Sequence, residues 1–149
     1  MVIINAADLR ALKKAAEAAW PSEACALLEG TRDGDALSVT VTVTRVHPAD
    51  NVATDPTRRF EADPHLLFLL HRELRNLPTK LVGVWHSHPD GSAQLSETDL
   101  ARAWDPNLVW LLTPVVDQRA VGTSAFRVRE ADKGNGQVGA FVPLDIYCS

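Results

Sequence analysis

The chain has 149 residues, of which 46% are hydrophobic and 23% are charged, close to the average of globular domains. This composition excludes a disordered chain, a collagen-like repeat and a coiled coil, and the length fits one domain over residues 1–149. Fifteen basic and nineteen acidic residues give a net charge of −4 with no basic cluster. We therefore expect no nucleic-acid partner, because phosphate backbones are bound by clustered Lys and Arg.

The cysteines and the apolar segments indicate the compartment. Cys25 and Cys148 are too few for a disulfide framework, which favours free thiols in a reducing compartment. No apolar run approaches the ~18 residues of a membrane span, and the N-terminal residues lack the basic start of a signal peptide. We expect a cytoplasmic protein without a membrane partner.

The first third of the chain predicts a helix and then a hairpin. Residues 6–20 carry Ala and Leu at helical spacing, with an N-cap signature at Asn5 and a stop at Pro21. A short apolar run, 25–30, is followed by turn-forming residues and by the segment 37–46, where apolar residues alternate with Thr and Ser. Because such alternation is typical of strands, we expect two paired strands here.

The middle of the chain predicts a loop, a helix and a central strand. Residues 47–62 have no periodicity, and a loop of this length in a compact domain is uncommon unless it is functional. A helix should begin at Asp63 or Pro64 and run to Leu77, the last leucine of its expected buried side. Residues 80–88 are apolar on both faces, as expected of a central strand.

The remaining elements alternate between helix and strand. We expect a helix over 96–104, strands over 107–116 and 124–130, and a turn at 133–137. Residues 140–148 predict a last strand at a sheet edge, because the proline within it cannot donate to a strand ladder. Helices and strands are interleaved, so the fold class is mixed α/β or α+β.

A group of polar residues follows the central strand. His86 and His88 project side by side, because residues two apart on a strand point to the same face. Asp99, in the first turn of the next helix, can reach back over the end of the strand. Two imidazoles and one carboxylate make three ligands for a zinc ion, Zn2+, and leave the fourth tetrahedral position open for water, as in catalytic zinc sites.

Each part of this pattern also has a structural explanation. A His-x-His pair alone is a weak indication of a metal site, and Ser96 with Asp99 has the form of a helix capping box. The combination is more specific, because a buried strand rarely ends in two imidazoles unless something satisfies their polar atoms.

The same residues resemble a known motif. The segment 86–89, His-Ser-His-Pro, followed by Ser96 and Asp99, resembles the JAMM motif of MPN-domain metalloproteases. That motif also includes an upstream glutamate, and residues 21–30 match the family pattern P-x-E-x-C-G-x-L-x-G, except that Ala26 stands where the family has Gly.

The resemblance implies a role for each matching residue. His86, His88 and Asp99 would be the zinc ligands, and Glu23 would be the general base that deprotonates the attacking water. Ser96 would steady the carbonyl oxygen of the substrate as it becomes an oxyanion.

The resemblance also implies a fold and a function. It covers about residues 1–130, and the tail after Glu130 carries no motif that we can place. The implied fold is a curved mixed β-sheet flanked by helices, similar to that of cytidine deaminases. The implied activity is zinc-dependent hydrolysis of a peptide or isopeptide bond after the C-terminal Gly-Gly of a ubiquitin-like or β-grasp sulfur-carrier protein.

Several alternatives stay open from the sequence. The domain could be a peptidase for a cell-wall or phage-tail peptide, or a non-catalytic MPN scaffold, although scaffolds typically lose zinc ligands. The identity of the carrier and of the leaving group is not encoded in the motif, and a homodimer is compatible with the sequence. Arg58 and Arg59, in the long loop, are either solvated charges or contacts to the substrate.

Overall fold

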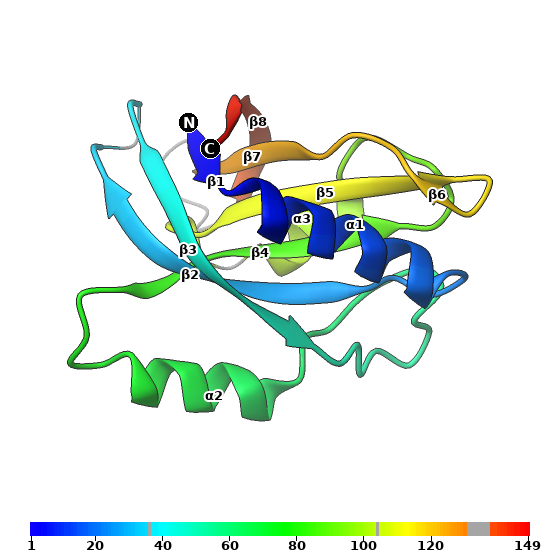
Figure 1. Ribbon diagram of the computed structural model, residues 1–149, viewed down its shortest axis with the longest axis horizontal. Helices are drawn as coiled ribbons and strands as arrows, with labels where there is room; N and C mark the ends of the chain where they lie inside the picture. The colour runs from blue at the N-terminus through cyan, green and yellow to red at the C-terminus, as the bar shows by residue number, and fades with distance from the viewer. Residues whose placement is uncertain (36, 104, 131–137) are drawn as a thin grey trace.

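The computed structural model describes residues 1–149 except 36, 104 and 131–137 (Figure 1). The helices in the described residues are α1 Ala6–Ala19, α2 Pro64–Glu73 and α3 Glu97–Arg102. The strands are β1 Val2–Ile4, β2 Cys25–Asp33, β3 Thr40–Ala49, β4 Lys80–His88, β5 Val109–Val116, β6 Arg119–Ala120, β7 Ser124–Glu130, β8 Val138–Leu144 and β9 Ile146–Cys148. The turn expected at 133–137 lies outside the described residues.

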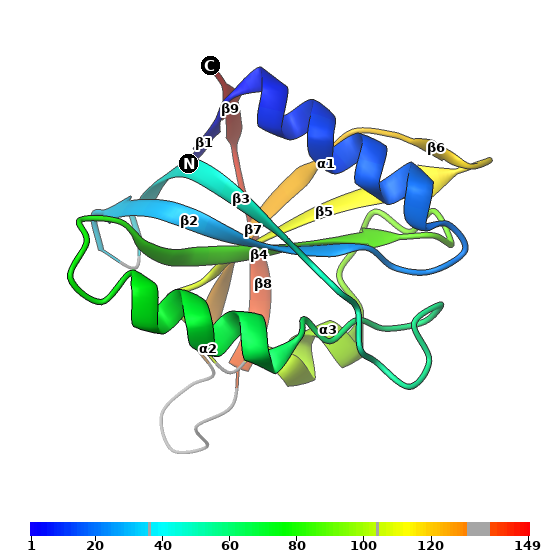
Figure 2. The same ribbon diagram turned by 60° about the horizontal axis from the view of Figure 1, so that its bottom comes forward.

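The described strands form one curved sheet. Their order is β8-β7-β5-β4-β2-β3-β1-β9, with β6 paired to β5. The expected hairpin is confirmed as the antiparallel pair β2 and β3, and β4 is central, between β2 and β5. β8 and β9 lie at opposite ends of the sheet although only Asp145 separates them in sequence, so the sheet curves until its ends approach each other (Figures 1 and 2). The expected mixed α/β fold with a curved sheet is confirmed.

The prediction of one strand over 140–148 is wrong. β8 pairs antiparallel with β7, whereas β9 pairs parallel with β1 at the other end of the sheet. The chain changes partner at Asp145, whose carbonyl oxygen accepts a hydrogen bond from the N–H of Val2 at 2.8 Å. The near closure of the sheet is the physical reason, because it brings the two edges close enough for one residue to connect them. Pro143 lies in the edge strand β8, as a residue without an N–H requires.

Helix α2 is shorter than expected. Asp63 is its N-cap, as predicted, but the helix ends at Glu73 and not at Leu77. The Nζ of Lys80 donates to the carbonyl oxygen of Leu74 at 2.6 Å, and to two more carbonyls in the turn that follows. This lysine satisfies carbonyl groups at the end of the helix that would otherwise lack a partner. Leu77, expected on the buried side, is 49% exposed because it lies beyond the helix.

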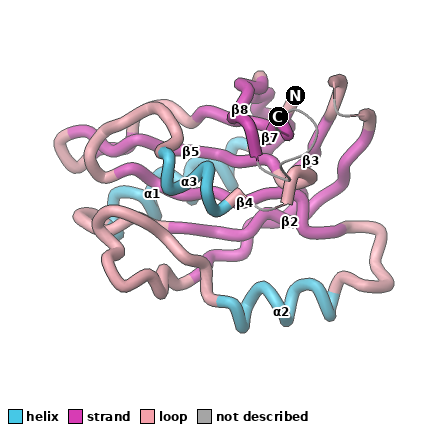
Figure 3. Tube along the Cα trace, turned by 180° about the vertical axis from the view of Figure 1, so that it is seen from behind, coloured by secondary structure: helices cyan, strands magenta, loops and turns pink. Residues whose placement is uncertain are grey.

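The helices cover opposite faces of the sheet. α1 lies in front of the strands in Figure 1, whereas α3 lies in front of them when the molecule is seen from behind (Figure 3). Figure 2 shows α2 on the same side as α3. On the α1 side, Leu12, Ala16 and the fully buried Trp85 belong to the main hydrophobic core. His86 and His88 follow Trp85 by one and three positions. Because side chains alternate between the faces of a strand, both histidines point to the opposite, α3 side of the sheet.

The two cysteines lie in different environments. Cys25 is buried, Cys148 is exposed, and both are free thiols. In the described part of the chain, no helix has the length and apolar character needed to span a bilayer.

The close packing of β4 against its neighbours predicts the effect of a small substitution. A Cβ atom at Gly83 would lie 2.6 Å from the carbonyl oxygen and 2.8 Å from Cγ2 of Val109 on β5. Gly83→Ala should therefore lower the free energy of unfolding by roughly 1–3 kcal/mol, as overpacking of a core does. Urea denaturation checks this, with Gly122→Ala as the control, since apart from Gly122 and its two chain neighbours no heavy atom of the described residues lies within 4 Å of a Cβ built there. Equal stability of the two variants would contradict the packing that we describe.

Candidate metal centre

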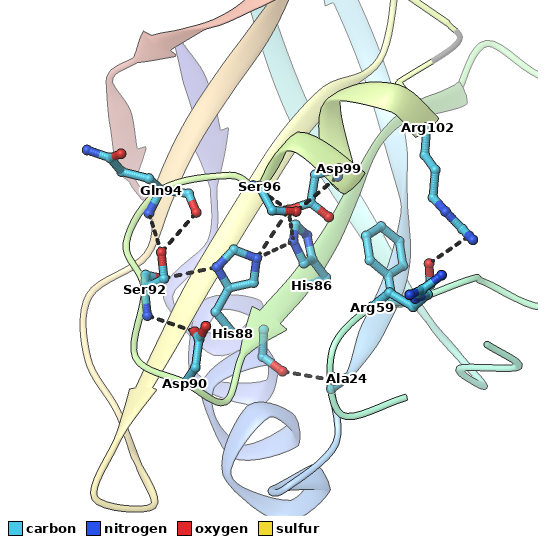
Figure 4. Close-up of polar contacts among 12 residues, drawn as sticks. Ala24, Arg59, His86, His88, Asp90, Ser92, Gln94, Ser96, Asp99 and Arg102 are labelled. Carbon is cyan, nitrogen blue, oxygen red and sulfur yellow. Dashed lines mark hydrogen bonds and ion pairs between the residues drawn. The ribbon is translucent and has the colours of Figure 1, made fainter. Parts of the chain in front are cut away.

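Strand β4 carries two histidines to one end of the sheet. His86 is fully buried and His88 is 6% exposed, and the two rings converge below α3 (Figure 4). Their Nε2 atoms lie 3.1 Å apart. Nδ1 of His88 lies 3.1 Å from the carbonyl oxygen of Ser92, to which it donates when it carries the ring proton. That bond leaves the lone pair of Nε2 free for a metal, which is the usual arrangement of histidine ligands.

The first turn of α3 places the carboxylate of Asp99. The N–H of Asp99 donates to Oγ of Ser96 at 3.0 Å, and the N–H of Ser96 donates to Oδ2 of Asp99 at 2.9 Å. The capping box expected as the structural explanation is therefore present, with Ser96 as N-cap and the helix over 97–102, shorter than the expected 96–104. The same Oδ2 atom lies 3.2 Å from Nε2 of each histidine. The carboxylate of Asp99 thus both caps the helix and contacts the two histidines, and the capping box holds it in place for that contact.

The three converging atoms fit a tetrahedral metal ion. The two Nε2 atoms and Oδ2 of Asp99 form a triangle with sides of 3.1, 3.2 and 3.2 Å. Ligands about 2.0–2.1 Å from a tetrahedral zinc ion lie roughly 3.3 Å from one another, close to these sides. The two imidazole nitrogens and one carboxylate oxygen are also suitable donors for such an ion. The group is compatible with a metal ion bound by three protein ligands.

Glu23 completes the cluster from another part of the sheet. It lies just before β2, is 5% exposed, and together with His86, His88 and Asp99 offers ligand atoms that all lie within 4.8 Å of one another. Its Oε1 atom finds no hydrogen-bond partner among the residues that the structure describes. Burial raises the pKa of Glu23 to about 7, although the nearby His88 acts in the opposite direction. A carboxyl group that titrates near neutral pH is suited to take up and release a proton.

The other three groups respond differently to burial. Burial alone would raise the pKa of Asp99, but in the metal-free chain hydrogen bonds from His86 and His88, made when their Nε2 atoms carry protons, outweigh burial and hold that pKa well below its usual range. Burial lowers the pKa of His86, which favours the neutral ring. Burial also acts to lower the pKa of His88, but the hydrogen bond and the charge of Asp99 outweigh it and raise this pKa. Asp99 is therefore ionised, which is the form in which a carboxylate can bind a metal ion.

Two aromatic side chains hold the ring of His86. The ring of Phe60 stacks on it with centroids 4.4 Å apart, and Trp110 meets it edge-on at 5.7 Å. The sequence did not indicate either contact, because Phe60 comes from the long loop and Trp110 from the neighbouring strand β5. The one signal is that Phe60 is the only Phe, Tyr or Trp within residues 47–62, and a large aromatic side chain in a loop is often packed against another part of the protein.

The cluster opens into a cleft of about 600 Å³. Glu23, His88 and Ser96 line it from the side of the cluster, and two loops line the rest. The loop residues are Thr57, Arg58, Pro89, Asp90, Ser92, Gln94 and Leu95. Of the two loop arginines, Arg58 lines the cleft, whereas Arg59 is outside its lining and uses its carbonyl oxygen to accept a hydrogen bond within the loop.

The sequence was compared with models of known protein families. Residues 5–129 match the model of the prokaryotic homologs of the JAB domain. The chain belongs to this family. The match confirms the resemblance to JAMM-type MPN domains, and its extent agrees with the expected 1–130.

Relatives of this JAB domain are known by name and by structure. The desampylase of Haloferax volcanii is 38% identical over 92 residues, which are 62% of this chain and 62% of that protein. The chain thus matches less than two thirds of the length of this relative. A solution structure of a Desulfitobacterium hafniense protein is 28% identical, with a TM-score of 0.78 over 100% of this chain and 93% of that one. A Salinibacter ruber protein is also 28% identical, with a TM-score of 0.68 over 100% and 92% of the chains.

The buried carboxyl of Glu23 predicts a pH effect on the metal-free JAB domain. Its pKa is about 7 in the folded chain and 4.5 without burial, so folding favours the protonated form. The contribution of Glu23 to the free energy of unfolding is therefore fully present below about pH 4.5 and is lost as the pH rises through about 7. Glu23→Gln removes the group, so its stability relative to the wild type should increase by roughly 3 kcal/mol between acid and alkaline pH.

Urea denaturation with a metal chelator, at a series of pH values, measures this difference. The control is Glu73→Gln, the same chemical change at an exposed glutamate of α2. A flat difference for Glu23→Gln would mean that burial does not perturb this carboxyl.

Proposed function

We propose that this protein is a zinc-dependent JAMM-type isopeptidase that acts after the C-terminal Gly-Gly of a ubiquitin-like or sulfur-carrier protein. The observation that carries the proposal is the buried carboxyl of Glu23 beside three converging ligand atoms at the end of a cleft. The likeness to a desampylase, whose name describes removal of a ubiquitin-like modifier, supports this substrate class. A scaffold would have no need for a buried, ionisable carboxyl of this kind.

We propose zinc as the metal and His86, His88 and Asp99 as its ligands. The nearly equilateral triangle of two nitrogens and one oxygen supports a small tetrahedral ion. When bound, zinc supplies a Lewis acid that polarises a carbonyl group and lowers the pKa of water to ~7.

We propose Glu23 as the general base of this reaction. In the proposed reaction the oxygen of a water attacks the carbonyl carbon of the substrate while Glu23 accepts a proton from that water. The same carboxyl then returns the proton to the departing amine as the C–N bond breaks. In the metal-free chain the pKa of Glu23 is about 7, and the carboxyl is only 5% exposed where it lines the cleft.

Ser96 can serve the reaction without giving up its cap. Its Oγ accepts the N–H of Asp99, which uses a lone pair and leaves the hydroxyl proton free to be donated. Ser96 also lines the cleft. We propose that it donates this proton to the carbonyl oxygen of the substrate as negative charge develops there.

The zinc assignment predicts which histidine matters for binding. The wild type should carry stoichiometric zinc, and His88→Ala should lose most of it because two ligands rarely hold the ion tightly. His71→Ala, at an exposed histidine of α2, should keep full zinc. Elemental analysis after dialysis against a weak chelator measures this, with thermal melts to show that both variants fold. Full zinc in His88→Ala would overturn the ligand assignment.

The proposed activity predicts cleavage of a ubiquitin-like conjugate. Wild-type protein should cut after a Gly-Gly tail, and Glu23→Gln should keep zinc but lose roughly 10²–10⁴ in rate, because Gln cannot accept a proton. A substrate with the last Gly replaced by Leu should resist, since a narrow site next to the cut bond favours small residues. Mass spectrometry of the products measures both. Cleavage by Glu23→Gln at the wild-type rate would remove Glu23 as the base, and equal cleavage of both tails would indicate a general peptidase.

A further inference from the structure

Glu23 lies outside regular secondary structure, so other contacts must hold it. Helix α1 ends at Ala19 and β2 begins at Cys25. The N–H of Glu23 donates to the carbonyl oxygen of Pro56 at 2.7 Å, and its own carbonyl oxygen accepts from Nδ2 of Asn51 at 3.0 Å. Both partners belong to the long loop between β3 and α2. The backbone of the proposed base is therefore fixed on this side by that loop.

The side chain of Asn51 organises the loop that holds Glu23. Its Nδ2 donates to two carbonyl oxygens at 3.0 Å and has a third at 3.5 Å, and its Oδ1 accepts two N–H groups at 3.0 and 3.1 Å. The carbonyls are those of Glu23, Arg59 and Pro56, and the N–H groups are those of Ala53 and Glu61. Only one orientation of the amide satisfies these contacts, because carbonyls surround the nitrogen and N–H groups surround the oxygen.

The other side of Glu23 is held by the metal-binding strand. The N–H of Ala24 donates to Oγ of Ser87 at 2.8 Å, and the N–H of Ser87 donates to the carbonyl oxygen of Ala24 at 3.0 Å. Ser87 lies between the two histidines. The backbone around Glu23 is thus hydrogen-bonded to β4 on one side and to the loop that contains Asn51 on the other. Ser87, on the first side, lies within the JAMM motif, whereas Asn51 lies outside it.

We propose that Asn51 is a positioning residue that fixes the carboxyl of Glu23 for proton transfer. The inference rests on the proposed function, because it assigns Glu23 the role of base. Asn51 acts through the backbone of Glu23 and through the loop, and does not itself contact the reacting atoms. An asparagine suits this position because one short side chain offers two donors and an acceptor.

The variant Asn51→Asp tests the donor side of this side chain. Aspartate has the same shape and keeps the oxygen that accepts from Ala53 and Glu61, but it turns an acceptor toward three carbonyl oxygens. We expect kcat to fall about 10²-fold, as for a misplacement of catalytic groups by about 1 Å, while zinc affinity stays unchanged. The control is Asn76→Asp, the same chemical change at an exposed asparagine, which should leave kcat and zinc affinity unchanged.

A double-mutant cycle shows whether Asn51 acts through Glu23. With Glu23→Gln as the background, measured by single-turnover rates with enzyme in excess, Asn51→Asp should cost less than roughly three-fold, because the base is already absent. The same loss in both backgrounds, or a loss of zinc affinity in Asn51→Asp, would overturn the proposal, because Asn51 would then act on the fold or on the metal site.

Hydrogen exchange tests the positioning without any substrate. In Asn51→Asp the amide of Glu23 should exchange at least about 10-fold faster, because its acceptor Pro56 lies in the loosened loop, while the amides of β4 keep their rates. Unchanged exchange at Glu23 would contradict the proposal. Because this measurement is independent of turnover, an inactive wild type with fast exchange in the variant would sink the proposed function and leave the role of Asn51 in positioning intact.

Discussion

The antiparallel pairing of β2 with β4 is the constraint on which the rest of the site depends. Cys25 is opposite His86 in this pair, and continuing the register by two residues puts Glu23 opposite His88. The start of one strand therefore meets the end of the other, and residues more than sixty positions apart in sequence become neighbours. The parallel neighbour β5 adds Trp110 beside His86, and α3 adds Asp99 from above. A shift of one residue would turn Glu23 to the wrong face.

The two buried carboxyl groups of the cluster, those of Glu23 and Asp99, have pKa values shifted in opposite directions. Oδ2 of Asp99 accepts a hydrogen bond from the N–H of Ser96 and lies 3.2 Å from Nε2 of each imidazole, so Asp99 stays ionised despite its burial. Glu23 has no such partner at Oε1, and the loss of hydration raises its pKa to about 7. These opposite protonation states agree with the proposed roles, in which Asp99 binds the metal ion and Glu23 exchanges a proton. Pairs of acids whose environments push their pKa values apart are a common feature of hydrolytic sites.

Local sequence patterns predicted the parts of the site that depend on local geometry. The two-residue period of a strand placed His86 and His88 on one face, and the capping pattern placed Asp99 at a helix start. Glu23 required the family resemblance, because the register of two strands distant in sequence is not encoded in either strand alone. The packing of Phe60 and the hydrogen bonds of Asn51 depend on how a non-periodic loop closes, so no pattern indicated them. The division of 140–148 into β8 and β9 followed from closure of the whole sheet, which is a tertiary property.

The most direct test of the central claim is a crystal structure of the zinc-loaded protein, with anomalous diffraction at the zinc edge. The account predicts one ion about 2.0–2.2 Å from Nε2 of His86, Nε2 of His88 and an oxygen of Asp99, with the carboxyl of Glu23 beyond bonding distance. An ion bonded directly to Glu23, or an ion bound away from the two histidines, would contradict it.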